Sequence, residues 1–503
     1  MRELSRSRKA LYTSVASLAL EVVNVLVALI VPRVIMATFG SEANGLAASI
    51  TQFVGYLMLL RIGIGGVLSA AMYEPLAYRD TKKISAVVNG SKKLYLKITY
   101  LSCVYIAILA VVYPLVVDSS FDYLYVGSMV LIVSASTLVQ CLIGMSYQLL
   151  LAADQKGYVT SILQIATSLV NMLLVLILVK CGCSYHVVKL GSAVVFILQP
   201  IVLKMYVSRH YQLDPQEPPK AMSTRQRKAG FIYSLSDFIH RRTDIFILTL
   251  VASLKDISVY SVYSVVTNGI TAVITMATGF FQAALGNMLA KKEDAVLKDT
   301  MNMYVCIVHA LSAVVFAVAI NTICPFVAIY TADVADADYI QPLFAVLILV
   351  AEMFFCLRQP YQSIIQAAGH FEQTKGASVI EAVVNLGISL LLVRRFGLPG
   401  VAFGTLCGMV YRTVSLMRYV SRNILKMSFW GQAMRYLVTL LNVLLVVVIT
   451  KNLVITSTDF IQWGLNAAVI TVISTAITGV ISFAVYPRVT SMTLKRIIRL
   501  VQR

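Results

Sequence analysis

Charged side chains inside long apolar runs are the residues of this chain best suited to bind an ion or a charged ligand. The densest group lies within residues 229–252. Its members fall on one helical stripe, at about 100° per residue, and are Asp237, His240, Arg241 and Asp244. Other charges in apolar surroundings are Glu21, Arg33, Arg61, Glu352, Arg358 and Glu381. Each costs about 2.5–3.5 kcal/mol at the centre of a membrane helix, so we expect them to pair with one another or to line a water-filled cavity.

Membrane-spanning helices must position these charges, because the sequence is a succession of apolar runs. A helix needs about 20 apolar residues to cross the hydrocarbon core, and the sequence contains about 14 such runs. We expect spans at 11–37, 45–72, 94–116, 123–152, 157–180, 184–206, 229–252, 258–290, 299–323, 341–368, 374–393, 398–420, 433–455 and 464–487. With 59% hydrophobic and 13% charged residues, the composition excludes an ordinary soluble domain. The expected fold class is an all-α polytopic membrane protein.

The distribution of charge between the spans predicts the orientation. Basic gaps alternate with acidic or neutral ones. The basic gaps hold Lys82, Lys83, Arg225, Arg227 and Lys495, and the others hold Glu42, Asp118, Asp333 and Asp459. Positive loops remain in the cytoplasm, so both termini are expected there and the number of spans is even. The formal charge of +19 then reflects topology and attraction to anionic inner-leaflet lipid, and we expect no nucleic-acid partner.

The two halves of the chain carry an echoed pattern. The segment that begins at Tyr147, contains a Lys-Gly loop and ends at Gln164 is matched by the segment from Tyr361 to Glu381. The offset is six helices, and an even offset predicts a parallel repeat about an axis along the membrane normal. A polar, proline-broken stretch at 214–220 predicts the linker between the halves. We expect an N-lobe at 1–206, a cytoplasmic linker at 207–228, a C-lobe at 229–420, and two further spans with a basic tail at 421–503.

Motifs for catalysis are missing from the sequence. It has no phosphate-binding glycine loop and no large outward loop, so we expect neither ATP hydrolysis nor an enzyme. The eight cysteines show no metal-binding spacing, and we expect no metal or organic cofactor. Those expected to face outward are Cys181, Cys183 and Cys324, which leaves one disulfide open.

Most of the charges also have a structural alternative. Arg33 follows Pro32 near the end of its run and could snorkel to the interface, as could Lys189. Arg61 lies deeper, beside Gly63, and is a stronger candidate for binding. The stripe within 229–252 contains both signs, so it could pair internally or face a lumen. Proton or cation sites, or helix-pairing residues, are Glu21, Glu352 and Glu381.

Short motifs resemble those of a known family. They are FGSEANGL at 39–46, QFVGY at 52–56, RIGIG at 61–65 and YEPLA at 73–77. Thr243-Asp244 and VYSVY at 259–263 are similar to the start of that family's second lobe. The family is the polysaccharide-biosynthesis flippases, the Wzx-type members of the multidrug/oligosaccharidyl-lipid/polysaccharide (MOP) superfamily. The helix count and the parallel repeat fit it over the whole length.

This resemblance implies two pseudo-symmetric six-helix lobes around a central cavity that opens alternately to each side, plus two C-terminal helices. The implied cargo is an oligosaccharide on an undecaprenyl pyrophosphate carrier. It would move from the inner to the outer face of the bacterial cytoplasmic membrane, for cell-surface polysaccharide. The lipid bilayer and the glycan polymerase machinery are the other implied partners.

The intramembrane charges suit such a cargo. A guanidinium binds pyrophosphate bidentately and stays charged, which makes Arg61 and Arg241 the first candidates, with Arg33 and Arg358 as further ones. The carboxylates could hold the arginines in place or carry a coupling H⁺ or Na⁺. They are Glu21, Asp237, Asp244, Glu352 and Glu381.

Three other functions compete with this interpretation. A drug antiporter of the same fold should have a cavity dominated by carboxylates and usually twelve helices. A lipid II flippase shares both the arginines and the helix number. A polytopic glycan polymerase or ligase should have a large outward catalytic loop, which the sequence lacks.

Overall fold

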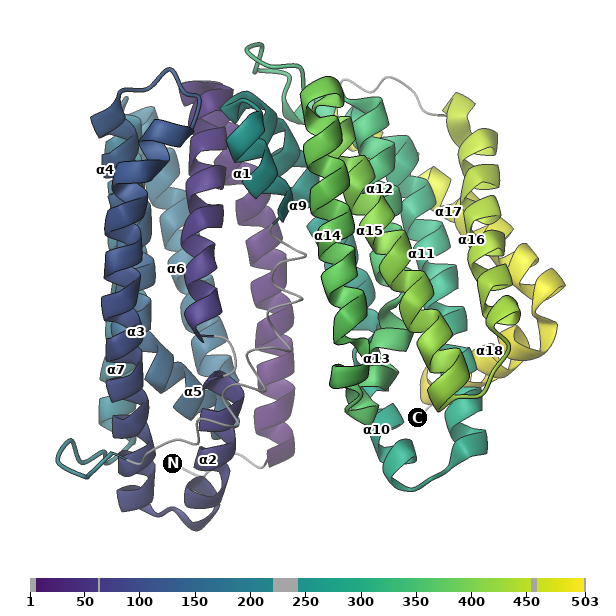
Figure 1. Cartoon of the computed structure of the whole chain (residues 1–503), viewed down its shortest axis with the longest axis horizontal. Coiled ribbons are helices and arrows are strands. Elements are labelled where there is room, and N and C mark those ends of the chain that lie inside the picture. Colours follow the sequence, from purple (N-terminus) through teal and green to yellow (C-terminus); the bar gives the residue numbers. More distant parts are fainter. Residues whose placement is uncertain (1–5, 62–63, 220–242, 454–458, 502–503) are drawn as a thin grey trace. The chain divides into compact units, whose positions relative to one another are not determined.

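The computed structural model describes residues 6–61, 64–219, 243–453 and 459–501, and every regular element in them is helical (Figure 1). Twelve of the described helices are long and apolar enough to cross a membrane. The expected all-α class is therefore confirmed. The sequence explains these helices. Long runs of Leu, Val, Ile and Ala favour hydrocarbon surroundings, and there a helix satisfies all backbone hydrogen-bonding groups within the segment.

Two features relate these twelve helices to the 14 expected spans. The first helix, α1 (Arg6–Gly55), combines the first expected span with part of the second. Residues 39–44 were expected to form an outward loop. In the structure the break is shorter: Gly40, with φ of 85° and ψ of 168°, is non-helical and separates two helical parts of α1. A glycine adopts this conformation without the strain of a side chain. The seventh expected span, 229–252, lies mostly outside the described residues, and a helix is seen over 243–251.

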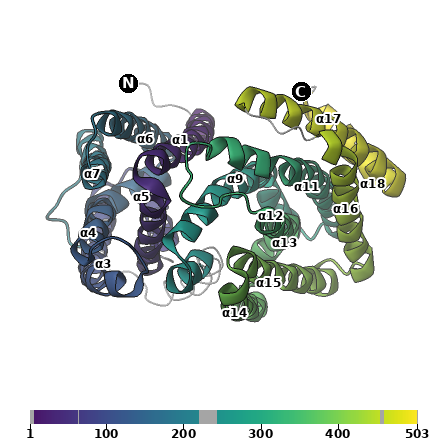
Figure 2. The same ribbon diagram turned by 90° about the horizontal axis from the view of Figure 1, so that it is seen from above.

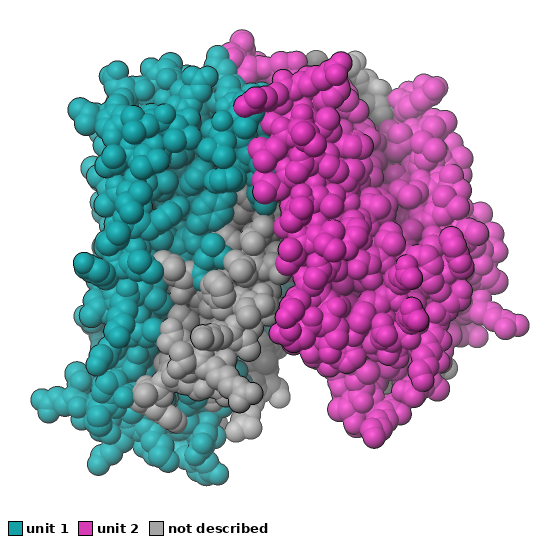
Figure 3. Space-filling view, viewed as in Figure 1, with its two compact units in different colours: residues 1–258 teal, residues 259–503 magenta. Residues whose placement is uncertain are grey.

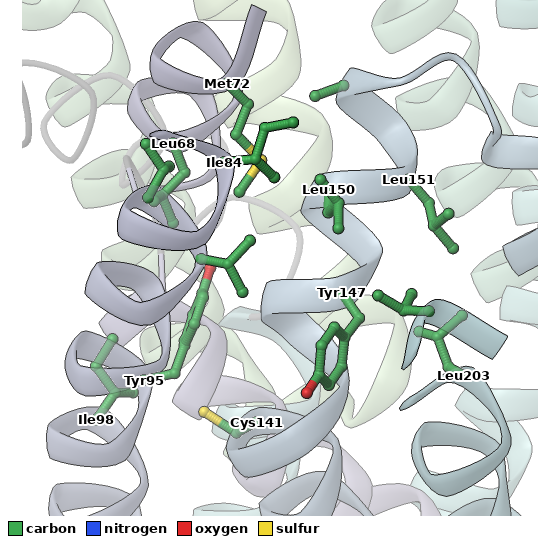
Figure 4. Close-up of a cluster of buried hydrophobic side chains, with 14 residues drawn as sticks. Leu68, Met72, Ile84, Tyr95, Ile98, Cys141, Tyr147, Leu150, Leu151 and Leu203 are labelled. Atoms are coloured by element: carbon green, nitrogen blue, oxygen red, sulfur yellow. The ribbon is translucent and has the colours of Figure 1, made fainter. Parts of the chain in front are cut away.

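The first of two compact units, unit 1, runs from Met1 to Ser258 (Figure 3). After α1 its elements are η1 (Tyr56–Arg61), α2 (Ile64–Tyr78), α3 (Thr81–Val116), α4 (Tyr123–Val139), η2 (Gln140–Gly144), α5 (Met145–Ala153), α6 (Gly157–Lys180), α7 (Tyr185–His210), the helix over 243–251 and the start of α9 (Leu254–Thr278). Helix α4 packs on α3 and α7, and α6 packs between α1 and α7 (Figure 1). A buried cluster joins α2, α3, α5 and α7 and includes Tyr95, Tyr147 and Leu203 (Figure 4).

Unit 2 runs from Val259 to Arg503. After α9 it contains α10 (Phe280–Ala290), α11 (Asp294–Tyr330), α12 (Pro342–Leu357), α13 (Gln359–Ala368), α14 (Phe371–Phe396), α15 (Leu398–Tyr419), η3 (Val420–Ile424), α16 (Phe429–Thr450), η4 (Lys451–Leu453), α17 (Phe460–Val485) and α18 (Pro487–Val501). Helix α15 packs closely on α12 and α14, and α11 packs on α12, α16 and α17 (Figure 2). The two expected C-terminal spans thus correspond to α16 and α17.

The boundary of unit 1 lies further along the chain than the expected end of the N-lobe at residue 206. The helix over 243–251 packs on the second part of α1, with the Ser49 and Thr249 hydroxyls 2.7 Å apart. At Gly45 an added Cβ would lie 1.8 Å from the Leu254 carbonyl oxygen, so only glycine allows this approach. Of the expected linker at 207–228, residues 211–219 form a non-helical segment after α7, and 220–228 lie outside the described residues. The expected pairing of lobes by a repeat remains a prediction.

Candidate functional site

The largest group of buried charge in the described residues is in unit 2. Arg358, at the junction of α12 and α13, donates through Nη1 to Oε1 of Glu381 on α14 at 2.7 Å. Both residues are only 3% exposed. Arg412 on α15 approaches the other oxygen, with Nε 3.8 Å from Glu381 Oε2. The carboxylate is thus held between two arginines from different helices, which offsets part of the cost of burying all three charges.

Close helix packing buries this ion pair. At Gly404 an added Cβ would lie 2.2 Å from the Ser389 hydroxyl, and at Gly408 it would lie 3.1 Å from the Glu381 carbonyl oxygen. The guanidinium of Arg358 also lies 4.9 Å from the centre of the Phe355 ring. Small residues on one helix therefore let α14 and α15 approach and seal the charges from their surroundings.

The sequence predicted two members of this cluster and missed the third. Arg358 and Glu381 were both singled out as intramembrane charges, but they were placed in different roles, as phosphate ligand and as coupling or pairing residue. Arg412 lies within the expected span 398–420, so the rule that found the other charges applies to it equally. What the sequence could not provide is that three helices bring these side chains together.

The other expected charges of the described chain lie in unit 1 and at the middle of α12. Glu21 and Arg33 are partly buried on α1, and Asp244, at the start of the helix over 243–251, is 7% exposed. Arg33, Asp244 and Glu352 each make at least one polar or electrostatic contact. Asp237 and Arg241 lie outside the described residues, as does the side chain of Arg61, whose backbone ends the 3₁₀-helix η1.

A cavity of about 380 Å³ lies within unit 1, between α1, α4 and α7. Apolar residues such as Val54, Val133 and Phe196 form part of its lining, and the polar part consists of Thr51, Ser136, Thr137, Lys189 and Ser192. The Lys189 ammonium lies 5.2 Å from the centre of the Tyr185 ring. None of the described carboxylates forms an ion pair with it.

Lys189 was expected to snorkel to the interface, and this remains a prediction. In the structure it is half-buried and lines this cavity, which also makes it a functional candidate. An ammonium among hydroxyl groups can bind a phosphate oxygen or another anion, and the hydroxyls can bond to sugar hydroxyls. The signal available in the sequence was the spacing from Lys189 to Ser192, which places the two on one helix face.

The family-like motif at 39–46 lies in the packing of unit 1. Glu42 accepts hydrogen bonds from the backbone N–H and the hydroxyl of Ser120, at 2.5 and 2.6 Å. Asn44 donates to the Ser258 hydroxyl at 2.8 Å. Together with the kink at Gly40 and the close approach at Gly45, these contacts position the second part of α1. The motif therefore builds the frame around the cavity rather than its lining.

One charged cluster joins three separate parts of unit 1 outside the spans. Asp154, after α5, pairs with Lys156 at 2.7 Å and with Lys9 of α1 at 3.5 Å, and it accepts a 2.5 Å hydrogen bond from the Tyr211 hydroxyl. Burial acts to raise the pKa of Asp154, but the bonds from Lys156 and Tyr211 outweigh it and hold this pKa below its ordinary value. Burial and the nearby carboxylate raise the pKa of Tyr211. The cluster fastens the start of α1 to the end of α7.

Comparison with solved structures identifies proteins with the same fold. A lipid II flippase, MurJ, in an inward closed conformation aligns over 95% of this chain and 99% of its own, with a TM-score of 0.71 and 13% identity. An inward-facing multidrug resistance MATE transporter of the MOP superfamily aligns over 82% of this chain and 96% of its own, with a TM-score of 0.59 and 15% identity. The eukaryotic MATE transporter AtDTX14 aligns over 86% and 98%, with a TM-score of 0.57 and 13% identity. No protein-family model matches the sequence, and no curated protein does. At these identities the likeness establishes a MOP-like fold.

Proposed function

We propose that this chain is a flippase. It moves an oligosaccharide on an undecaprenyl pyrophosphate carrier from the inner to the outer face of the bacterial cytoplasmic membrane, by alternating access. The observation that carries this proposal is the extent of the fold match. The alignment with the lipid II flippase covers 95% of the chain, whereas those with the two MATE transporters cover 82% and 86%. The longer alignment supports a flippase over a drug antiporter.

Lys189 in unit 1 supports the same proposal. It lines a cavity together with four hydroxyl-bearing residues and has no described carboxylate partner, and such a cation attracts phosphate strongly in a low-dielectric setting. Arg61, Arg241 and Arg33 are the proposed bidentate ligands of the pyrophosphate. Arg358 is a weaker candidate than the sequence indicated, because Glu381 already engages its guanidinium.

Coupling to H⁺ or Na⁺ is proposed for the carboxylates of the membrane region. Glu381 is held by two arginines, so ion pairing is its better supported role. Glu21 is partly exposed on α1 and is a more accessible proton site. The other candidate coupling carboxylates are Asp244, Glu352 and Asp237.

The second candidate function is a lipid II flippase, which the fold match to MurJ favours. The motifs at 39–46 and 61–65 favour the polysaccharide branch instead. The two candidate functions differ in the lipid-linked cargo. Expression in a strain depleted of its lipid II flippase distinguishes them: rescue of growth supports the alternative, and rescue of surface polysaccharide in a polysaccharide-flippase-null strain supports the proposal.

The direct test of the binding residues uses that second strain. Arg61→Ala and Arg241→Ala should each reduce surface glycan about tenfold or more, since a charge-assisted hydrogen bond contributes about 1.5–3 kcal/mol. Arg→Lys should restore part of the export, because charge returns without the planar fork. Arg422→Ala, at an exposed position of η3, is the matched control, and membrane abundance is measured for every variant. Full export by both alanine variants at Arg61 and Arg241 would refute the pyrophosphate clamp.

The proposed orientation has both termini in the cytoplasm. Single cysteines at Ser119 and Ala335 should react with an impermeant reagent added to intact cells, and those at Ser223 and Ser491 should react only after permeabilisation. External labelling at Ser491 would reverse the topology.

A further inference from the structure

A basic groove lies on the surface of unit 1 between α3 and α7. Its volume is about 640 Å³. Lysines line it from both helices, Lys92 and Lys93 on α3 and Lys204 on α7. Both helices contact the π-helical turn η2, whose Leu142 and Ile143 also line the groove. π-Helical turns inside longer helices are frequent at functional sites.

The floor of the groove belongs to the hydrophobic core of unit 1. Tyr147, which lines it, belongs to the buried cluster that includes Tyr95 and Leu203 (Figure 4). The Lys92 ammonium lies 5.1 Å from the centre of the Tyr147 ring. The groove is therefore built by side chains that pack independently of any ligand.

The three lysines are not neutralised within the described residues. No described carboxylate lies within the 4.0 Å of an ion pair from Lys92, Lys93 or Lys204. The segment that lines the groove after α7 carries Asp214 and Glu217, but neither carboxylate forms an ion pair with these lysines. Three cations that line one groove without a carboxylate in ion-pair range attract an anion.

The same groove also has an exposed apolar part. Leu96 on α3 and Leu142 on η2 line it and are 57% and 42% exposed. A free phosphate ion would leave this apolar surface uncovered. A phospholipid would cover it with acyl chains and place its phosphate among the lysines.

We propose that this groove binds one anionic glycerophospholipid of the inner leaflet, with its phosphate held by Lys92, Lys93 and Lys204 and its acyl chains along Leu96 and Leu142. The site is separate from the cavity at Lys189, with which it shares no lining residue. Its place in the inner leaflet rests on the orientation proposed above. The bound lipid would hold the cytoplasmic ends of α3 and α7 together over η2.

The test uses the full chain in vesicles and a tryptophan reporter, Leu96→Trp. The native tryptophans, Trp430 and Trp463, both belong to unit 2, and unmodified protein gives their contribution for subtraction. Phosphatidylglycerol or phosphatidylcholine with brominated acyl chains is added in increasing mole fraction. Since each lysine near a membrane contributes about fivefold in affinity for anionic lipid, half-maximal quenching should need at least about fivefold less phosphatidylglycerol than phosphatidylcholine.

Matched variants and one competitor make the result decisive. Lys92→Gln/Lys93→Gln/Lys204→Gln should abolish the preference, whereas Lys82→Gln/Lys291→Gln/Lys292→Gln, an equal charge change at exposed lysines elsewhere, should keep it. Equal quenching by both lipids, or a preference that survives the first triple variant, would overturn the proposal. Loss of the preference on adding millimolar inorganic phosphate would also overturn it, because the site would then take a free anion. Quenching does not depend on transport, so this result stands apart from any test of flipping.

Discussion

Lys189 in unit 1 and Arg358 in unit 2 are both cations within membrane-spanning helices, but their surroundings differ. Arg358 is 3% exposed and bonded to Glu381 at 2.7 Å. Lys189 is half-buried beside a cavity of about 380 Å³ and pairs with no carboxylate among the described residues. The first arrangement uses charge to join helices, and the second leaves charge available to a ligand.

This contrast gives a physical criterion for assigning roles to intramembrane charges. A buried ion pair must lose its partner before it can bind a ligand, which costs several kcal/mol. A cation that lines a cavity meets an anion without that loss. The criterion makes opposite predictions for the two units, since charge removal should affect folding in unit 2 and binding in unit 1.

The largest expected effect is on stability, at Glu381. Replacing it with leucine leaves Arg358 and Arg412 without this carboxylate, which should lower the free energy of unfolding by about 3–5 kcal/mol. Thermal unfolding of the purified protein in detergent measures this. Arg358→Leu/Glu381→Leu should recover part of the loss, because the more deeply buried charge of Arg358 is gone while Arg412 keeps its charge.

The control for this prediction is Glu372→Gln, which breaks the exposed pair with Lys375 on the same helix. Exposed pairs contribute under about 1 kcal/mol, so the unfolding temperature should hardly change. If Glu381→Leu were as mild as this control, the contrast between the units would fail.

An intermediate effect is expected where α14 and α15 approach. Gly404→Ala places a Cβ 2.2 Å from the Ser389 hydroxyl and 2.8 Å from its backbone nitrogen, so it should destabilise the protein by about 1–3 kcal/mol. Gly387→Ala, on α14, meets nothing within 4 Å and should be neutral or slightly stabilising. Equal unfolding temperatures for the two variants would contradict the close packing that seals the ion pair.

The smallest effect concerns Asp154, whose pKa is held low in the folded protein. A carboxyl with a lowered folded pKa stabilises the fold fully above its unfolded pKa of about 3.9, and this stabilisation is lost as the pH falls through the folded value. The free energy of unfolding of Asp154→Asn should therefore be lower than that of the unmodified protein by under about 1 kcal/mol at neutral pH. This difference in stability should become smaller below about pH 4. Asp118→Asn, an exposed change, should show no such difference. If this difference in stability became larger in acid, the lowered pKa of Asp154 would be contradicted.

Hydropathy alone predicted most of the fold, because a membrane span depends on the composition of one contiguous stretch of the sequence. At 39–44 it predicted a break between two spans, and the structure shows that break at the non-helical Gly40, without a longer loop. The contacts of Glu42 with Ser120 and of Asn44 with Ser258 satisfy the polar residues there. A polar gap therefore predicts where a helix is interrupted but not how many residues lie outside the helices.

The sites were harder to predict, because pairing depends on which helices are neighbours. Glu381 and Arg358 are 23 positions apart, and their types indicated either a ligand site or an ion pair. The packing of α12, α14 and α15 shows that they form an ion pair. The cavity beside Lys189 could not be predicted for the same reason, since the position of a residue along a span does not tell whether a cavity or lipid lies beside it.

The measurement that tests the central claim most directly is flipping by the purified protein in proteoliposomes. The vesicles carry a fluorescent oligosaccharide on undecaprenyl pyrophosphate, and a reductant added outside reports the fraction that reaches the outer leaflet. The account predicts that the unmodified protein exposes the inner pool much faster than protein-free vesicles do. Lys189→Met should slow this about tenfold, since one charge-assisted contact is lost, while Glu372→Gln keeps the full rate. A rate with the unmodified protein no higher than in protein-free vesicles, or full activity of Lys189→Met, would contradict it.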